Sequence, residues 1–180
     1  MHLTLFAFEL SLVNFLFFEP PGPTGPDGLP KTVSQGLAEH PGVGVALFIC
    51  IIIETTQVLV HSCSRAVCAV LMWATLASLL GVLLYPCDGP DTVEHMVFAG
   101  GFFISTLLLC LLCWYEEKSH WLQALAVVVV FVFLFVSFYV WPAAIGALEA
   151  TYFYFMINAW SPHPGWKKCG SVTSLFKIDL

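Results

Sequence analysis

The sequence has few charged residues, and this scarcity excludes an ordinary soluble domain. Only 10% of its 180 residues are Asp, Glu, Lys or Arg, whereas 59% are hydrophobic and 15% are aromatic. Soluble domains contain roughly 25% charged residues, so a soluble core does not explain this composition. The six Lys and Arg residues are spread along a chain whose formal net charge is −6. Because they form no basic patch, nucleic acid is not an expected partner.

Catalytic and metal-binding motifs are also missing from the sequence. The six histidines are scattered, and they form neither H-x-x-x-H nor H-E-x-x-H. No serine lies in a G-x-S-x-G sequence. A hydrolase that uses a zinc-bound water is therefore the least favoured class of function, and no cofactor or metal is expected.

Long apolar runs make up most of the chain. The run from Trp121 to Trp141, WLQALAVVVVFVFLFVSFYVW, carries no formal charge and has a tryptophan at each end. A hydrocarbon core about 30 Å thick needs about 20 apolar residues in a helix, and Trp favours the two membrane interfaces. We therefore expect this run to cross a bilayer. Comparable runs elsewhere predict an all-α, multi-pass transmembrane bundle that forms a single domain over residues 1–180.

Turn signals divide the chain into six expected helices. These cover Leu3–Phe18, Val43–His61, Ala66–Tyr85, Val93–Trp114, Trp121–Trp141 and Ala143–Trp160. Five spans are the alternative, because Pro142 could instead kink one long helix or open a re-entrant segment. The Pro- and Gly-rich segment from Glu19 to Pro41 is expected to be the one long loop.

The distribution of Lys and Arg favours six spans with both termini in the cytosol, because short cytosolic loops collect these residues. In this topology the long loop, residues 19–41, lies on the non-cytosolic side, and residues 161–180 form a cytosolic tail. One side of the membrane then receives only Lys31, and the other receives Arg65, Lys118, Lys167, Lys168 and Lys177.

Ionisable side chains within the expected helices are the candidate functional residues, because each costs about 2.5 to 3.5 kcal/mol at mid-membrane. At a rise of about 1.5 Å per residue, Glu9 and Glu54 share a level near the cytosolic side, with His61 on the same stripe as Glu54. His95 and Glu149 fall in the opposite half, and we expect a hydrogen bond between them. These groups are interpreted either as protonated, helix-linking carboxyls or as a site for a proton, an ion or a lipid headgroup.

Two further patterns are interpreted as packing features. The small residues Ala99-Gly100-Gly101 are expected to let a neighbouring helix approach closely. Cys110 and Cys113 match C-x-x-C, but they lie within an apolar helix without a second pair. They are therefore expected to be small buried hydrophobic residues.

The layout resembles the Frag1/DRAM/Sfk1 family, which includes the damage-regulated autophagy modulators and the post-GPI-attachment factors. The loop is similar to the family's P-x-(I/V)-S…G…P pattern, the fourth helix to H-x-x-G-A, and the last helix to A-x-x-E-W. The matching residues are Pro30, Val33, Ser34, Gly36, Pro41, His95, Ala99, Gly100, Ala147, Leu148 and Glu149. The resemblance implies a six-helix endomembrane protein, with His95 and Glu149 as the positions carried over.

A second resemblance is to the transmembrane protein 45 family. The matches are local and comprise His2-x-Thr4-Leu5-Phe6-x-Phe8, the spacing from Glu54 to His61, and the segment that begins at Glu149.

Together, these features predict a non-enzymatic, multi-pass endomembrane protein of the Golgi, endoplasmic reticulum or lysosome. It would handle lipids or lipid-anchored proteins or act as a membrane scaffold, with membrane lipids and other membrane proteins as partners. The alternative is a proton, ion or small-solute transporter or channel, and an intramembrane lipid hydrolase is less favoured.

Overall fold

The computed structural model describes residues 7–9, 11–15, 32–61, 65–85, 87, 92–116 and 121–160. All regular structure within these residues is helical, which confirms the all-α prediction. Residues 7–9 and 11–15 belong to the first expected helix. The other elements are α2 Val33–Glu39, α3 Pro41–His61, α4 Arg65–Leu84, α5 Thr92–Glu116, α6 Trp121–Val140, the 3₁₀ turn η2 Pro142–Ala144 and α7 Ile145–Trp160.

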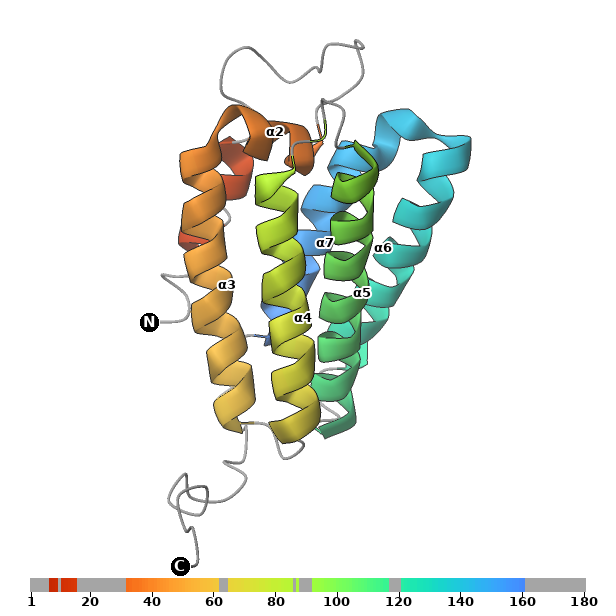
Figure 1. The fold of residues 1–180 in the computed structure, drawn as a ribbon. Coiled ribbons are helices and arrows are strands. Elements are labelled where there is room, and N and C mark those ends of the chain that lie inside the picture. Colours follow the sequence, from red (N-terminus) through yellow and green to blue (C-terminus); the bar gives the residue numbers. More distant parts are fainter. Residues whose placement is uncertain are drawn as a thin grey trace, which may run out of the picture.

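The long helices form a bundle with the short α2 lying across one end (Figure 1). Helix α4 packs between α3 and α5, and α6 packs extensively against α7. Helix α5 contacts α6 less extensively than it contacts α4. Pro142 lies in η2, and α7 then returns along α6. The chain therefore turns sharply at Pro142 instead of continuing as one kinked helix.

Helix α2 corrects the prediction of an unbroken loop over residues 19–41. Residues 19–31 lie outside the described part of the chain, but Val33–Glu39 is helical. Thr32 is its N-cap: the Thr32 side chain accepts from the Gln35 N–H, and the Gln35 side chain accepts from the Thr32 N–H. This reciprocal capping box satisfies two backbone donors that a helix start would otherwise leave unpaired.

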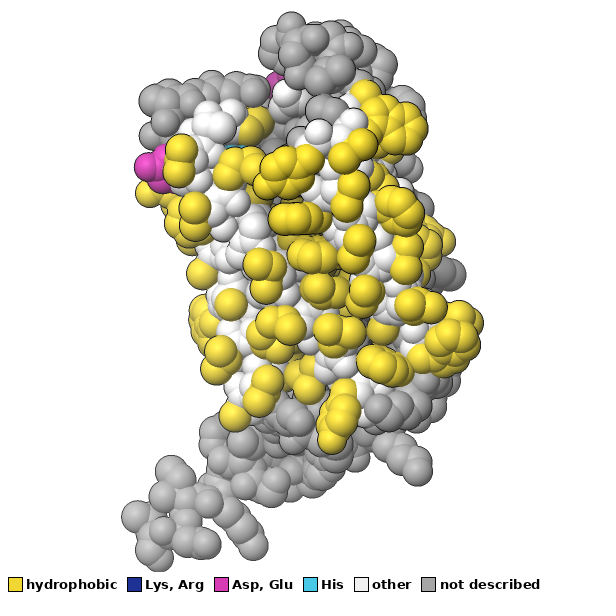
Figure 2. Space-filling view, turned by 90° about the vertical axis from the view of Figure 1, so that its right-hand side faces the viewer, with side chains coloured by type: hydrophobic (Ala, Val, Ile, Leu, Met, Phe, Trp, Pro, Cys, Tyr) yellow, Lys and Arg dark blue, Asp and Glu magenta, His cyan; other side chains and the backbone are white. Residues whose placement is uncertain are grey.

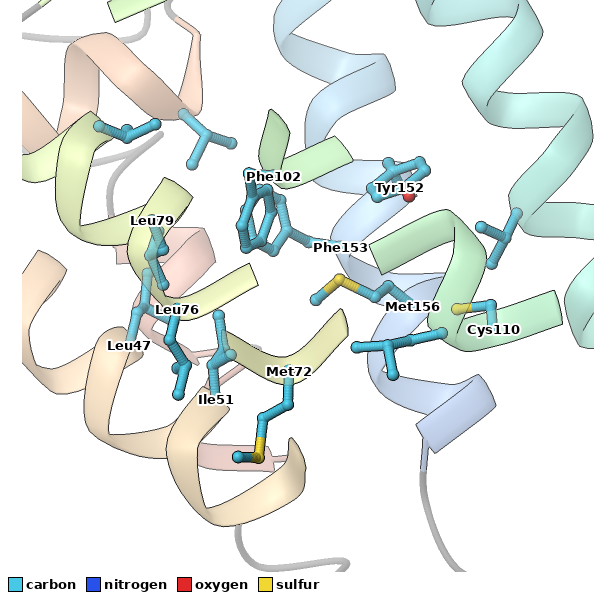
Figure 3. Close-up of a cluster of buried hydrophobic side chains, with 14 of the residues drawn as sticks. Leu47, Ile51, Met72, Leu76, Leu79, Phe102, Cys110, Tyr152, Phe153 and Met156 are labelled. Atoms are coloured by element: carbon cyan, nitrogen blue, oxygen red, sulfur yellow. The ribbon is translucent and has the colours of Figure 1, made fainter. Parts of the chain in front are cut away.

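The hydrophobic core runs through the bundle and includes buried side chains from α2, α3, α4, α5, α6 and α7. Phe102 of α5 and Phe153 of α7 stack with their ring centroids 5.4 Å apart, and Figure 3 shows Met156 close to this pair. Cys110 and Cys113 are buried in this cluster. Their predicted role as small buried hydrophobic residues is confirmed.

Hydroxyl groups link the helices across the core. Oγ1 of Thr75 in α4 donates to Oγ of Ser105 in α5 at 3.0 Å. The Tyr152 hydroxyl of α7 donates to the Phe103 carbonyl at 2.9 Å and lies 2.8 Å from Oγ1 of Thr106. Bonds of this kind between membrane helices contribute about 0.6 to 2 kcal/mol each. They also keep hydroxyl groups satisfied where no water is present.

The outer surface of the bundle is strongly apolar. Trp73, Phe133 and Tyr139 are 67, 59 and 80% exposed. Figure 2 shows hydrophobic side chains along the face viewed, with Asp and Glu side chains only near one end of its described part. Three helices are long and apolar enough to cross a membrane, over Pro41–Val60, Ala66–Leu84 and Thr92–Tyr115, and the stretch Trp121–Ser137 is apolar but shorter. Their length and composition indicate a membrane protein.

Close helix packing at Gly81 leads to a stability prediction. A methyl group at Gly81 in α4 would overlap the Phe98 ring of α5, so Gly81→Ala should destabilise the bundle by about 1 to 3 kcal/mol through overpacking. Gly100→Ala is the matched control, because a methyl group there meets no heavy atom within 4 Å. Thermal unfolding in detergent should show a lower midpoint for Gly81→Ala only. Equal midpoints would contradict the packing of Phe98 on Gly81.

Candidate functional site

A cavity of about 820 Å³ lies between α5 and α6 at the end of the bundle that carries α2. Helix α2, the N-terminal half of α5, the C-terminal half of α6 and the start of α7 all contribute to its lining. Its apolar walls include Phe103, Ile104, Phe131, Leu134 and Phe135. Its polar groups include Thr32, Ser34, Gln35, His95 and Glu149. The cavity therefore combines apolar walls with a set of polar groups contributed by α2, α5 and α7.

Gly100 helps to explain why α5 leaves this space open. A methyl group at Gly100 would meet no heavy atom within 4 Å, whereas one at Gly101 would lie 2.7 Å from the Ser78 hydroxyl oxygen of α4. Gly101 thus packs against α4, and Gly100 lines the cavity. The predicted packing role of the Ala99-Gly100-Gly101 segment is confirmed for Gly101 and is wrong for Gly100.

Glu149 holds the start of α2 against α7. Its Oε2 accepts a hydrogen bond from the Val33 N–H at 2.7 Å, and the Ser34 N–H faces the same carboxyl group. The Gln35 N–H bonds to the Thr32 side chain, and the Thr32 N–H bonds to the Gln35 side chain. These contacts reach all four N–H groups, from Thr32 to Gln35, that the helix start leaves without an intrahelical partner. Helix α2 has no acidic residue in its first turn, and the carboxyl group of Glu149 from α7 lies there instead.

His95 pairs with a backbone carbonyl group at the C-terminal end of α4. Helix α4 ends at Leu84, and Nδ1 of His95 lies 2.7 Å from the carbonyl oxygen of the next residue, Tyr85. A carbonyl oxygen can only accept, so Nδ1 carries a proton and donates it. His95 is only 3% exposed and lines the cavity.

The predicted hydrogen bond between His95 and Glu149 is wrong. His95 bonds to Tyr85, and Glu149 bonds to α2. The two side chains nevertheless line the same cavity, which agrees with their predicted placement in one half of the bundle. Each side chain bonds to a backbone group at a helix end, because such groups lack an intrahelical partner and are costly to bury unpaired.

Glu9 and Glu54 form a second buried group, which is separate from the cavity. Glu9 is fully buried and Glu54 is 6% exposed, and their carboxyl groups lie close to each other. No donor from the described residues reaches either oxygen of Glu9 or Oε2 of Glu54. A carboxylate can only accept, so a bond between two carboxyl groups requires a proton on one of them. The prediction that the two residues share a level agrees with this contact.

His61 is the last residue of α3, and its side chain lies outside the described part of the structure. Among the described residues, no group of three or more His, Cys, Asp or Glu side chains is arranged to hold a metal ion. The proposed roles of Glu9, Glu54, His61, His95 and Glu149 as functional residues stay predictions.

The contribution of α2 to the cavity was missed by reasoning from the sequence. Thr32, Ser34 and Gln35 line the cavity, but they follow a segment rich in Pro and Gly that is typical of loops. A signal was present, because Thr32 and Gln35 match the S/T-x-x-E/Q pattern of a capping box.

Comparison with known proteins shows no relationship: no family model, no curated protein and no solved structure matches the chain.

The geometry of the cavity suits an amphiphilic molecule. Its volume of about 820 Å³ lies within the range of roughly 300 to 1,000 Å³ that is typical of small-molecule sites. Aromatic and aliphatic side chains can surround a hydrocarbon part, while Ser34, Gln35, His95 and Glu149 can hydrogen-bond to a polar part.

The role of Glu149 as a cap for α2 can be tested by substitution. Glu149→Ala should leave the Val33 N–H buried without a partner, and it should reduce the free energy of unfolding by about 1 to 3 kcal/mol. Glu149→Gln keeps an acceptor oxygen of similar reach and should lose less. Thermal unfolding measures the cost, and hydrogen exchange at the Val33 amide locates it. If both variants exchange this amide as slowly as the unaltered protein, Glu149 does not cap α2.

Proposed function

We propose that the chain is a multi-pass membrane protein that binds a lipid in the cavity between α5 and α6. The observation that carries this proposal is the cavity itself, whose size, apolar walls and polar groups match the two parts of a lipid. An apolar wall favours a hydrocarbon chain over a water-soluble ligand, because polar groups placed against it would lose hydrogen bonds to water without replacement.

The position of the cavity supports access from the membrane. Its walls belong mainly to α5 and α6, and these helices also expose hydrophobic side chains outside the cavity, such as Val97 and Phe133. The face of the bundle viewed in Figure 2 is apolar as well. A lipid moving from the bilayer into the cavity would therefore leave one apolar surrounding for another.

The chain is proposed to act without catalysis, as a protein that handles lipids or lipid-anchored proteins or as a membrane scaffold. Its proposed location is an endomembrane, with other membrane proteins as partners, as the resemblance to the Frag1/DRAM/Sfk1 family implies. The distribution of Lys and Arg supports six spans with both termini in the cytosol. The proposed cytosolic tail, residues 161–180, lies outside the described residues.

Filling the cavity provides the test of lipid binding. Gly100→Leu places a side chain in the open space, whereas Gly42→Leu places the same side chain where no heavy atom lies within 4 Å, on the exposed start of α3. Lipid retained by the detergent-purified protein should fall severalfold for Gly100→Leu and stay constant for Gly42→Leu. Native mass spectrometry measures the retained lipid. If both variants retain as much lipid as the unaltered chain, lipid does not bind in this cavity.

The buried pair of Glu9 and Glu54 favours a second candidate function, the transport of protons or cations. Two buried carboxyl groups that lie close together and away from other donors can bind a proton or a cation between them and release it. These residues belong to the first helix and α3, so this function would use a different part of the bundle.

Transport can be tested in liposomes with the protein reconstituted. Glu54→Gln keeps a side chain of similar size whose amide can donate to Glu9, but it removes one titratable group. If the pair carries protons, flux down a pH gradient should fall to the level of empty liposomes in Glu54→Gln and persist in Gly42→Leu. Flux that is equal in the unaltered protein and Glu54→Gln would exclude this role for the pair.

A further inference from the structure

The hydrogen bonds at the polar end of the cavity determine what His95 can offer a ligand. Its Nδ1 donates to the Tyr85 carbonyl oxygen at 2.7 Å. In a neutral imidazole only one nitrogen carries a proton, so Nε2 is left with a lone pair and can only accept. Because His95 lines the cavity, it presents an acceptor there.

Gln35 offers a hydrogen-bond donor to a ligand. Its Oε1 accepts from the Thr32 N–H at 2.9 Å, which fixes the orientation of the side-chain amide. The amide N–H₂ group is then the part of Gln35 left to donate to a ligand. Gln35 also lines the cavity, together with the Ser34 side chain. The polar end therefore combines an acceptor on His95 with a donor on Gln35.

Charged head groups match these two side chains less well than an uncharged one. A carboxylate or phosphate offers only acceptors, so it cannot donate to Nε2 of His95. An ammonium group donates, but it cannot accept from Gln35. Either charged group would also lose more hydration on entering an apolar site than an uncharged group does.

We infer that the cavity binds a lipid whose polar head is an uncharged hydroxyl group, which donates to Nε2 of His95 and accepts from the amide of Gln35. This inference rests on the proposed lipid-binding function and specifies the class of lipid. A hydroxyl group has one donor and two acceptor positions, so it meets both side chains at once. The alcohol of a diacylglycerol and that of a sterol both have this chemistry.

The experiment compares four photoreactive, alkyne-tagged probes in phosphatidylcholine nanodiscs that contain the full chain. They are a diacylglycerol, a sterol, a fatty acid and a long-chain primary amine. At least one hydroxyl probe should label α5 and α6 about tenfold more than the fatty acid and the amine, which corresponds to about 1.4 kcal/mol. The more strongly labelling hydroxyl probe identifies the source of the alcohol. Labelling by the fatty acid or the amine that equals or exceeds that of both hydroxyl probes would overturn the inference.

Variants separate this inference from the proposed function. His95→Phe keeps a ring of similar size but removes the acceptor, so the preference for hydroxyl probes should disappear. A folded His95→Phe variant that keeps the full preference would overturn the role of His95. If this variant does not fold, the comparison of probes on the unaltered chain decides.

Gly100→Leu tests the cavity itself. If all four probes label the unaltered chain equally and Gly100→Leu abolishes this labelling, only the hydroxyl assignment is overturned. If every probe labels Gly100→Leu as strongly as it labels the unaltered chain, lipid binding in the cavity is overturned.

Discussion

The hydrogen bond between Glu149 and the start of α2 is the interaction on which the site depends. A short helix that lies across an apolar bundle exposes four N–H groups at its start, and each is costly to bury without a partner. Thr32 and Gln35 satisfy part of this need from within α2, but the first amide, that of Val33, bonds to Glu149 on α7. One carboxyl group thus joins residues far apart in the sequence and positions the helix that lines one side of the cavity.

The need to pair buried polar groups also explains several other polar residues of the bundle. His95 satisfies the Tyr85 carbonyl at the end of α4, and Thr75 bonds to Ser105 between α4 and α5. Some of the polar side chains that pair with helix ends also line the cavity. His95, Gln35 and Glu149 therefore form the polar part of the cavity while they hold the backbone. Gly100 leaves the room that a larger side chain would occupy.

The long helices could be predicted from the sequence, whereas the contacts between polar residues could not. Runs such as Trp121–Trp141 have a length and composition that few other structures accommodate, so the helix bounds followed from them. Depth along a helix placed His95 and Glu149 at the same end, but it does not say which groups meet there. Their partners are the Tyr85 carbonyl and the Val33 amide, and backbone groups leave no trace in a sequence. Helix α2 was not predicted, because the residues before it are rich in Pro and Gly, although Thr32 and Gln35 match a capping box.

The three buried carboxyl groups differ in what the surrounding structure provides. Glu149 receives backbone donors at the start of α2. The carboxyl groups of Glu9 and Glu54 lie close to each other, and no donor from the described residues reaches either oxygen of Glu9 or Oε2 of Glu54. A change in protonation should therefore leave the start of α2 in place when it occurs at the Glu9 and Glu54 pair, because no described contact links the pair to Glu149. The cavity and the acid pair are thus two separate features of one bundle, and a function that uses one does not require the other.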